Sequence, residues 1–98
     1  MAWMYILQCG DGSYYVGSTR DLAQRILQHM SGQGSRYTSG RLPVKLVYVE
    51  EYERISEAYF REKQVQGWSR VKREALIHGD FGQLPELARK NFRGKRLE

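Results

Sequence analysis

Hydrophobic and polar positions recur along this chain at two spacings, and each spacing predicts a kind of element. Residues 3–9 are apolar and β-favouring, and residues 14–17 resume that pattern after a turn rich in Gly, Asp and Ser, so both segments predict strands. Residues 44–52 predict a third strand, which follows Pro43 because proline cannot donate to a strand ladder.

A helical spacing replaces the strand pattern between the second and third strands. Leu22, Ile26 and Met30 recur at intervals of four, which predicts a helix over residues 21–30 with these three side chains as its buried stripe. Residues 31–41 are rich in Gly and Ser and predict a loop.

Further helices are predicted after the third strand, over about residues 56–66, 69–78 and 85–91. Ser18 or Thr19 is expected to cap the earlier helix with its hydroxyl group. The order of elements predicts a small α+β domain with three strands.

The segment from Tyr5 to His29 combines a phenol, a guanidinium and an imidazole. Tyr5 and Tyr15 lie on the two predicted strands, while Arg25 and His29 lie four residues apart on one face of the predicted helix. Such groups suit the handling of a phosphodiester. The alternative is that they are ordinary strand aromatics, a solvated arginine and a structural histidine.

The length of the first hairpin loop decides whether the two tyrosines share a face of the sheet. The Asp-Gly pair favours a two-residue turn, which would place Tyr5 and Tyr15 on opposite faces. A three-residue loop over residues 10–12, with Gly12 left-handed, would instead place Tyr15 opposite Leu7, on the same face as Tyr5. A shared site requires this odd register, and we predict it.

Composition indicates one folded domain with a polyanionic partner. The 98 residues, predicted to form a single domain over 1–98, carry a formal net charge of +5, with the excess in the C-terminal half. Nucleic acid is the first expectation and acidic lipid the second, against a soluble domain that merely happens to be basic. The basic segment from about residue 91 is expected to be a flexible tail.

Cysteine usage and hydropathy bear on the compartment. Cys9 is the single cysteine, so no internal disulfide can form, and we expect it to be a small core residue. No apolar run approaches the length of a membrane span, and the N-terminus lacks the features of a signal peptide. The expected location is therefore the cytoplasm, with no membrane partner.

With these motifs in place, the chain resembles the GIY-YIG nuclease-like family, of the small stand-alone bacterial type. Trp3-Met4-Tyr5 keeps only the tyrosine of the first motif, whereas Tyr15-Val16-Gly17 matches the second closely. The resemblance covers about residues 3–79. It continues through Ser18, Thr19, Leu22, Arg25 and His29, then Gly34, Tyr37 and Thr38, then Ala58, Arg61, Glu62, Lys63 and Trp68.

The resemblance implies a small three-stranded antiparallel sheet flanked by helices, and phosphodiester cleavage assisted by one divalent cation, Mg²⁺ or Mn²⁺. Tyr5 or Tyr15 would orient or deprotonate the attacking water, and Arg25 would grip the phosphate. His29 would position a phosphate or protonate the leaving oxygen. Glu62 would hold the metal, and the alternative is a surface salt bridge. Zinc is not expected, because no set of His and Cys ligands is evident.

Basic and aromatic residues elsewhere predict a nucleic-acid surface, with DNA ahead of RNA. The segment around Tyr37 can wrap a strand and stack on a base, or be an ordinary connector. The leading hypothesis is a structure-selective endonuclease. The alternatives are a non-catalytic nucleic-acid-binding module and a domain that binds an acidic protein. The sequence does not determine an oligomeric state. The candidate contacts are Arg36, Tyr37, Arg41, Arg61, Lys63, Arg70, Lys72 and Arg73.

Overall fold

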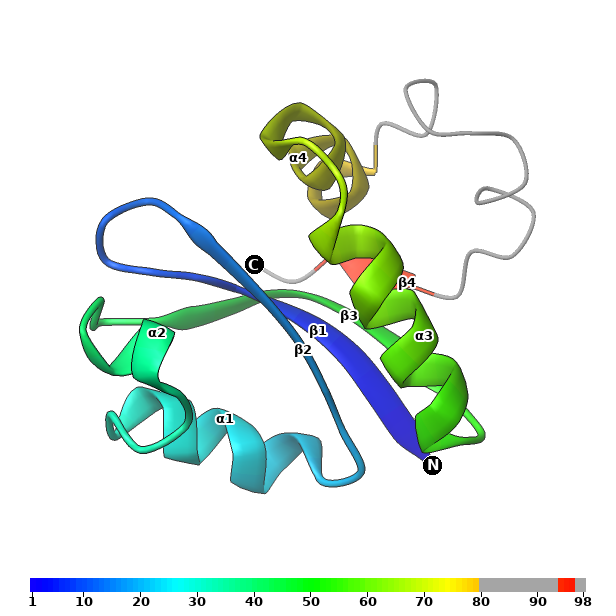
Figure 1. The fold of residues 1–98 in the computed structure, drawn as a ribbon, viewed down its shortest axis with the longest axis horizontal. Helices are drawn as coiled ribbons and strands as arrows, with labels where there is room; N and C mark the ends of the chain where they lie inside the picture. The colour runs from blue at the N-terminus through cyan, green and yellow to red at the C-terminus, as the bar shows by residue number, and fades with distance from the viewer. Residues whose placement is uncertain (80–93, 97–98) are drawn as a thin grey trace.

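A small antiparallel sheet forms the centre of the protein. The computed structural model describes residues 1–79 and 94–96. It confirms the predicted α+β fold with three antiparallel strands, and adds a short fourth strand at the outer edge of β3 that the sequence did not predict (Figure 1). The sheet order is β2-β1-β3-β4, with β1 (Ala2–Gln8), β2 (Tyr14–Thr19), β3 (Lys45–Tyr52) and β4 (Gly94–Arg96).

Helices cover both faces of this sheet. The segment expected to be a loop contains the short helix α2, and the helix expected near residues 85–91 lies outside the described residues. Within the described ranges, no helix has both the length and the apolar character needed to cross a bilayer. The helices are α1 (Leu22–Met30), α2 (Arg36–Ser39), α3 (Ile55–Gln66) and α4 (Arg70–His78) (Figure 1).

The first hairpin has the odd register predicted from the sequence. The Cys9 amide donates to the Ser13 carbonyl at 2.8 Å, which closes a three-residue loop. Gly12 supplies the left-handed residue with φ of 84°, a conformation that glycine adopts without a steric penalty. Tyr15 therefore pairs with Leu7 and projects from the same face of the sheet as Tyr5.

Each face of the sheet has its own apolar cluster. A shift in the pairing of β1 with β3, between Ile6 and Leu7, interrupts the alternation, so that Val47 and Tyr48 both reach the same cluster. The face under α3 and α4 includes Met4, Ile6, Val16, Val47, Tyr48, Val65, Leu76 and Ile77. The face under α1 includes Tyr5, Leu7, Cys9 and Val44, with Leu22 and Ile26 packed against them.

The buried stripe of α1 differs from the one predicted. Met30 is 55% exposed, whereas His29 is completely buried. Leu22, Ile26 and His29 follow the i, i+4, i+7 pattern, which is as regular as the predicted one but rotated by one position. Hydropathy predicts that methionine is buried in preference to histidine. Here His29 is buried instead, because its ring forms a hydrogen bond with Tyr5 on the sheet.

The cap of α1 also differs from the prediction. The side chain of Asp21, rather than that of Ser18 or Thr19, accepts a hydrogen bond from the Gln24 amide at 3.1 Å. Thr19 accepts a hydrogen bond from the Asp21 amide at 3.0 Å, so it fixes the turn just before the cap.

Candidate active site

Tyr5 lies at the centre of a buried polar chain. It is on the central strand, only 1% exposed, and its hydroxyl lies 2.8 Å from Nε2 of His29. Nδ1 of His29 lies 2.9 Å from the Thr38 hydroxyl, which donates to the Ser35 carbonyl at 3.4 Å. Because the Thr38 hydroxyl donates to Ser35, its oxygen can accept a hydrogen bond from Nδ1–H of His29. We therefore assign Nε2 as the atom that accepts the hydrogen bond from the Tyr5 hydroxyl.

Burial keeps both members of the Tyr5–His29 pair neutral. It raises the pKa of Tyr5 to about 12, an effect that nearby Arg25 opposes and that Tyr15 and Glu62 reinforce. Burial, together with the positive charge of Arg25, lowers the pKa of His29 to about 4. Arg25, Tyr15 and Glu62 all affect the pKa of Tyr5. The candidate residues from β1, β2, α1 and α3 therefore lie around one phenol.

Tyr15 extends the site toward the surface. It is half-buried, and its ring centroid lies 5.0 Å from that of His29 and 6.4 Å from that of Tyr5. Within the part of the chain that the structure describes, the Tyr15 hydroxyl has no hydrogen-bond partner. Gly17 leaves room for the pair, since a Cβ atom at this position would lie 2.5 Å from the Tyr5 hydroxyl oxygen.

Arg25 lies beside the buried stripe of α1 and is half-buried. Its Nη1 donates to the Gln28 side chain at 3.0 Å. Among the described residues, no carboxylate forms an ion pair with it. A guanidinium that is partly desolvated and not neutralised can bind an anion strongly.

Glu62 is the acidic member of the site. Helix α3 buries it against β2, where the Ser18 hydroxyl donates to Oε1 at 2.7 Å and the Gln66 amide donates to Oε2 at 3.0 Å. The exposed Lys63 lies 3.3 Å from Oε2.

The donor set around Glu62 determines which metals the site suits. The described residues contain no group of three His, Cys, Asp or Glu side chains arranged to hold a metal. One carboxylate with a hydroxyl nearby fits Mg²⁺ or Mn²⁺, which fill their remaining positions with water and substrate oxygens. The set does not fit zinc, which takes nitrogen and sulfur ligands.

Two of the expected nucleic-acid contacts are engaged in the scaffold. Arg61 is buried, and its Nε lies 2.9 Å from Glu50. Arg73 donates to the backbone carbonyls of Val65 and Gln66 at the end of α3. Arg61 is buried with its donors engaged, and Arg73 has two of its donors engaged with the backbone, so we leave both arginines out of the proposed interface.

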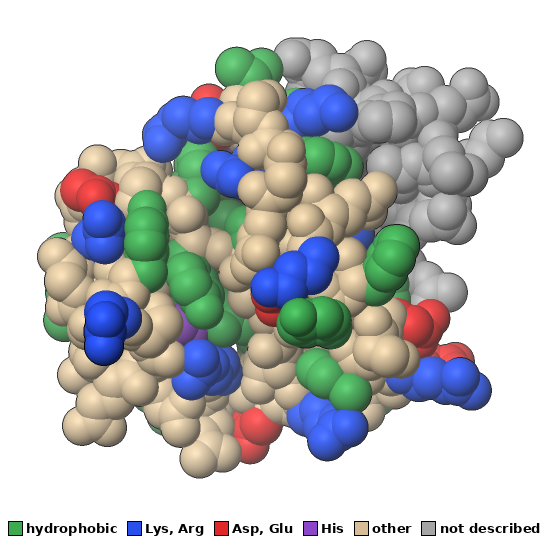
Figure 2. Space-filling model, in the orientation of Figure 1, with side chains coloured by type: hydrophobic (Ala, Val, Ile, Leu, Met, Phe, Trp, Pro, Cys, Tyr) green, Lys and Arg blue, Asp and Glu red, His purple; other side chains and the backbone are tan. Residues whose placement is uncertain are grey.

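The other expected contacts lie nearer the surface. Arg36 and Tyr37 are exposed on α2, and Lys63 is exposed on α3. On the space-filling surface, hydrophobic side chains gather over the sheet between α2 and α3, with Lys and Arg side chains on both sides of them (Figure 2). Arg70 lies 3.5 Å from Glu74 and over the ring of Tyr14, which packs against the apolar cluster on the other face of the sheet, so we leave Arg70 out of the proposed interface as well. Lys72 lies over the Trp68 ring.

Sequence reasoning missed several side chains that support the site. Ser18 and Thr38 lie in the segments that carry the family resemblance, but their roles depend on contacts with distant residues. Gln66 lies one helical turn after Glu62, which was its only signal in the sequence. Gly34 packs directly against the His29 ring, where a Cβ atom would clash.

Comparisons with known proteins identify the family and the fold of the chain. The GIY-YIG catalytic domain matches residues 1–75. A UPF0213 protein of Halobacterium salinarum is 42% identical over 79% of this chain and all of its own length, and one of Staphylococcus saprophyticus is 45% identical over 76% of this chain and 92% of its own. The solution structure of a UPF0213 protein from Bacillus halodurans, 42% identical, superposes with a TM-score of 0.54 over 85% of this chain and 89% of that one. The chain belongs to the GIY-YIG catalytic-domain family, whose members have nuclease-type activity.

Proposed function

We propose that this protein is a divalent-metal-dependent endonuclease that cleaves phosphodiester bonds in nucleic acid, with DNA ahead of RNA. The observation that supports the proposal is the convergence of Tyr15, Arg25, His29 and Glu62 around Tyr5. No two of these residues are neighbours in the sequence, and each brings a group that phosphoryl transfer uses.

The chain's own residues have distinct roles in this proposal. Arg25 binds the non-bridging oxygens as negative charge develops on them. Tyr15 orients the attacking water. Tyr5 accepts the proton of that water while its own proton passes to Nε2 of His29, so the phenol is never released as a free phenolate. This role differs from the direct phosphate contact expected for His29, because the ring is completely buried behind Tyr5.

Glu62 is the proposed metal ligand, with Ser18 and Gln66 holding its carboxylate in place. A bound Mg²⁺ or Mn²⁺ would supply charge neutralisation at the leaving oxygen. Lys63 is exposed, so its ammonium group can exchange Glu62 for the phosphate backbone.

The altered first motif is compatible with activity. Met4, one of the residues that depart from the motif, belongs to the apolar cluster under α3 and α4, on the face opposite Tyr5. A methionine at this position therefore does not displace the Tyr5 hydroxyl. We expect backbone contacts from Arg36 and Lys63 to favour particular nucleic-acid structures rather than particular sequences. The proposed location is the cytoplasm, where the thiol of Cys9 stays reduced.

The second candidate function is a non-catalytic nucleic-acid-binding module. The raised pKa of Tyr5 favours it, because a phenol with a pKa of about 12 stays protonated at neutral pH and supplies almost no phenolate to act as a base.

A nicking assay on plasmid and branched DNA, with and without Mg²⁺ or Mn²⁺, distinguishes the two candidates. Metal-dependent cleavage that is lost in both Arg25→Ala and Glu62→Gln supports the endonuclease. Arg54→Ala, at an exposed position before α3, is the control and should cleave normally. Salt-sensitive DNA binding without cleavage would establish the binding module instead.

A further inference from the structure

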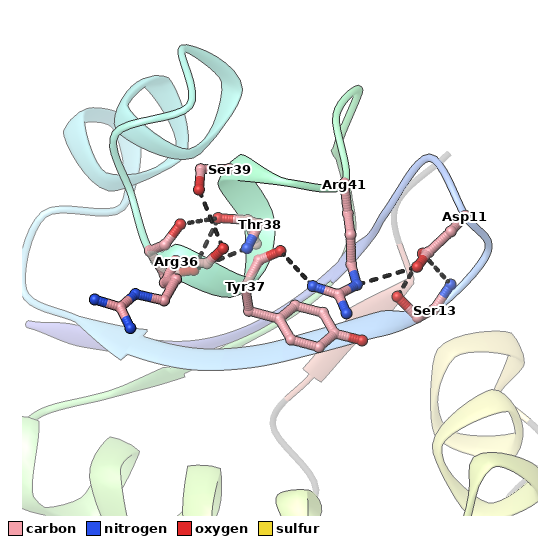
Figure 3. A network of polar contacts seen from close by, with 8 residues as sticks. Asp11, Ser13, Arg36, Tyr37, Thr38, Ser39 and Arg41 are labelled. Carbon is pink, nitrogen blue, oxygen red and sulfur yellow. Dashed lines mark hydrogen bonds and ion pairs between the residues drawn. The ribbon is translucent and has the colours of Figure 1, made fainter.

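Arg41 is held rigidly between the first hairpin and α2. Its Nε lies 3.1 Å from Oδ2 of Asp11, and its Nη1 donates to the Tyr37 carbonyl at 3.0 Å (Figure 3). The guanidinium carbon lies 3.9 Å from the centroid of the Tyr37 ring. Asp11 is fixed in turn by the amide and hydroxyl of Ser13, at 3.0 and 2.6 Å. The guanidinium plane therefore has a defined orientation.

These contacts make Arg41 poorly suited to gripping a phosphate. Its charge is paired with Asp11, and hydrogen bonds from Ser13, together with Arg41 itself, lower the pKa of that carboxyl, so the pair is ionised at neutral pH. The fork that would bind two phosphate oxygens already has two of its donors engaged. The flat face of the guanidinium group remains available to a ligand, since 39% of the Arg41 side chain is exposed.

This flat surface connects with the candidate active site through aromatic rings. The Tyr37 centroid lies 6.1 Å from that of Tyr15, which in turn lies 5.0 Å from that of His29. Arg41 is thus the outermost member of a run of neighbouring, tilted rings that ends at the buried Tyr5–His29 pair.

We propose that the outer face of Arg41 is a stacking platform for an unpaired base next to the scissile phosphate, and that the protein therefore selects single-stranded or splayed nucleic acid over continuous duplex. The placement of the scissile phosphate rests on the proposed function. Bases within a duplex stack on one another and present only their edges, whereas an unpaired base has a free π-face that a guanidinium plane can cover.

The molecule contains a matched control for this platform. Arg70 lies 4.7 Å over the Tyr14 ring and 3.5 Å from Glu74, so it has the same three components. Tyr14, however, packs against the apolar cluster on the other face of the sheet. Arg41→Lys and Arg70→Lys both keep the positive charge and remove a guanidinium plane, and only the first should affect stacking.

The test measures the binding of a fluorescently labelled oligonucleotide, as a single strand and annealed to its complement, in EDTA at fixed salt. We expect Arg41→Lys to weaken single-strand binding by about fivefold or more and to leave duplex binding nearly unchanged. Arg70→Lys should bind both forms like the wild type. Tyr37→Leu, which removes the supporting ring but keeps Arg41, should reproduce the selective loss.

Two results would overturn the platform. One is wild-type single-strand binding in both Arg41→Lys and Tyr37→Leu, and the other is an equal loss on both forms of the oligonucleotide. Thermal unfolding of each variant identifies a loss caused by misfolding, in which case the more stable of the two variants decides. Binding in EDTA is independent of cleavage, so a failed nicking assay would reject the endonuclease without changing this result.

Discussion

Both faces of the sheet bury a polar network built from tyrosine and arginine, and the two networks differ in one respect. Under α3 and α4, the carboxylate of Glu50 accepts hydrogen bonds from Tyr48, Tyr52 and both Nε and Nη2 of Arg61. Under α1, Tyr5 bonds to a neutral histidine, and Arg25 lies nearby with no carboxylate paired to it among the described residues.

The two networks differ in whether the positive charge of their arginine is neutralised by a carboxylate among the described residues. Burial and then the charge of Glu50 raise the pKa of Tyr48, and that network has every charge matched within the fold. The network under α1 leaves a positive charge available for a ligand. Arg61 and Glu62 are adjacent on α3, so the ion pair to Glu50 also sets the rotation that turns Glu62 toward β2.

The largest effect is expected from breaking the matched network. Glu50→Gln keeps the shape of the side chain but leaves the Arg61 charge buried without its counter-ion. We expect the free energy of unfolding to fall by about 3–5 kcal/mol, measured by urea denaturation. The exposed neighbour on the same strand supplies the control, and Glu51→Gln should lie within about 0.5 kcal/mol of the wild type.

Replacing both partners sharpens this result. Glu50→Leu combined with Arg61→Leu removes the two charges together, and most of the lost stability should return. A double variant as unstable as the single one would show that the network does more than match two charges.

Arg25→Ala is the counterpart on the other face. Since the positive charge there is not matched within the described fold, its removal should change unfolding by less than about 1 kcal/mol while the cleavage rate falls by about 10²–10³-fold. Single-turnover cleavage with saturating metal measures the rate. A large loss of stability with the rate per folded molecule unchanged would place Arg25 in the scaffold beside Arg61.

The buried histidine predicts a dependence of stability on pH. The pKa of His29 is about 4 in the folded chain, below its ordinary value, so the unfolded chain binds a proton first as the pH falls. Stability should therefore decrease between about pH 6.5 and 4, by on the order of 3 kcal/mol. His29→Asn should flatten this part of the profile. His78→Asn, at an exposed histidine, should not, and equal flattening by both variants would contradict the assignment.

The smallest effect is expected from Ser18, which donates a hydrogen bond to the proposed metal ligand, Glu62. Ser18→Ala removes the hydrogen bond to Oε1 of Glu62, and we expect the affinity for Mn²⁺ to fall by about tenfold, measured by titration calorimetry. Ser56→Ala on the exposed side of α3 serves as the control. Unchanged Mn²⁺ affinity in Ser18→Ala would argue that the metal ligand is elsewhere.

Several features of the fold could be predicted because local physics fixes them. The hairpin register depends on the length of its loop and on Gly12, and the prediction was confirmed. The α4 helix was predicted to end near residue 78, and the next residue, Gly79, takes the left-handed conformation that closes a helix. Membership of the GIY-YIG family was also evident from the ordered motifs.

Predictions that depended on distant partners were less successful. Arg61 and Lys63 look alike in the sequence, yet one is buried against Glu50 and the other is exposed. Met30 was predicted to be buried, and the sequence did not decide whether His29 is structural or functional. Hydropathy carries no information about the hydrogen bond from Tyr5 that holds His29 inside. The segment around Tyr37 read as a loop because a four-residue helix has no periodic pattern of its own.

The sequence by itself determined the three longer strands, the main helices, the family and the types of side chain available for chemistry, since these depend on neighbours within a few residues or on ordered motifs. Only the tertiary structure decided which charged groups are matched by a partner and which are left for a ligand. That outcome depends on contacts between residues such as Ser18 and Glu62, far apart in the chain, whose free energy no local pattern encodes.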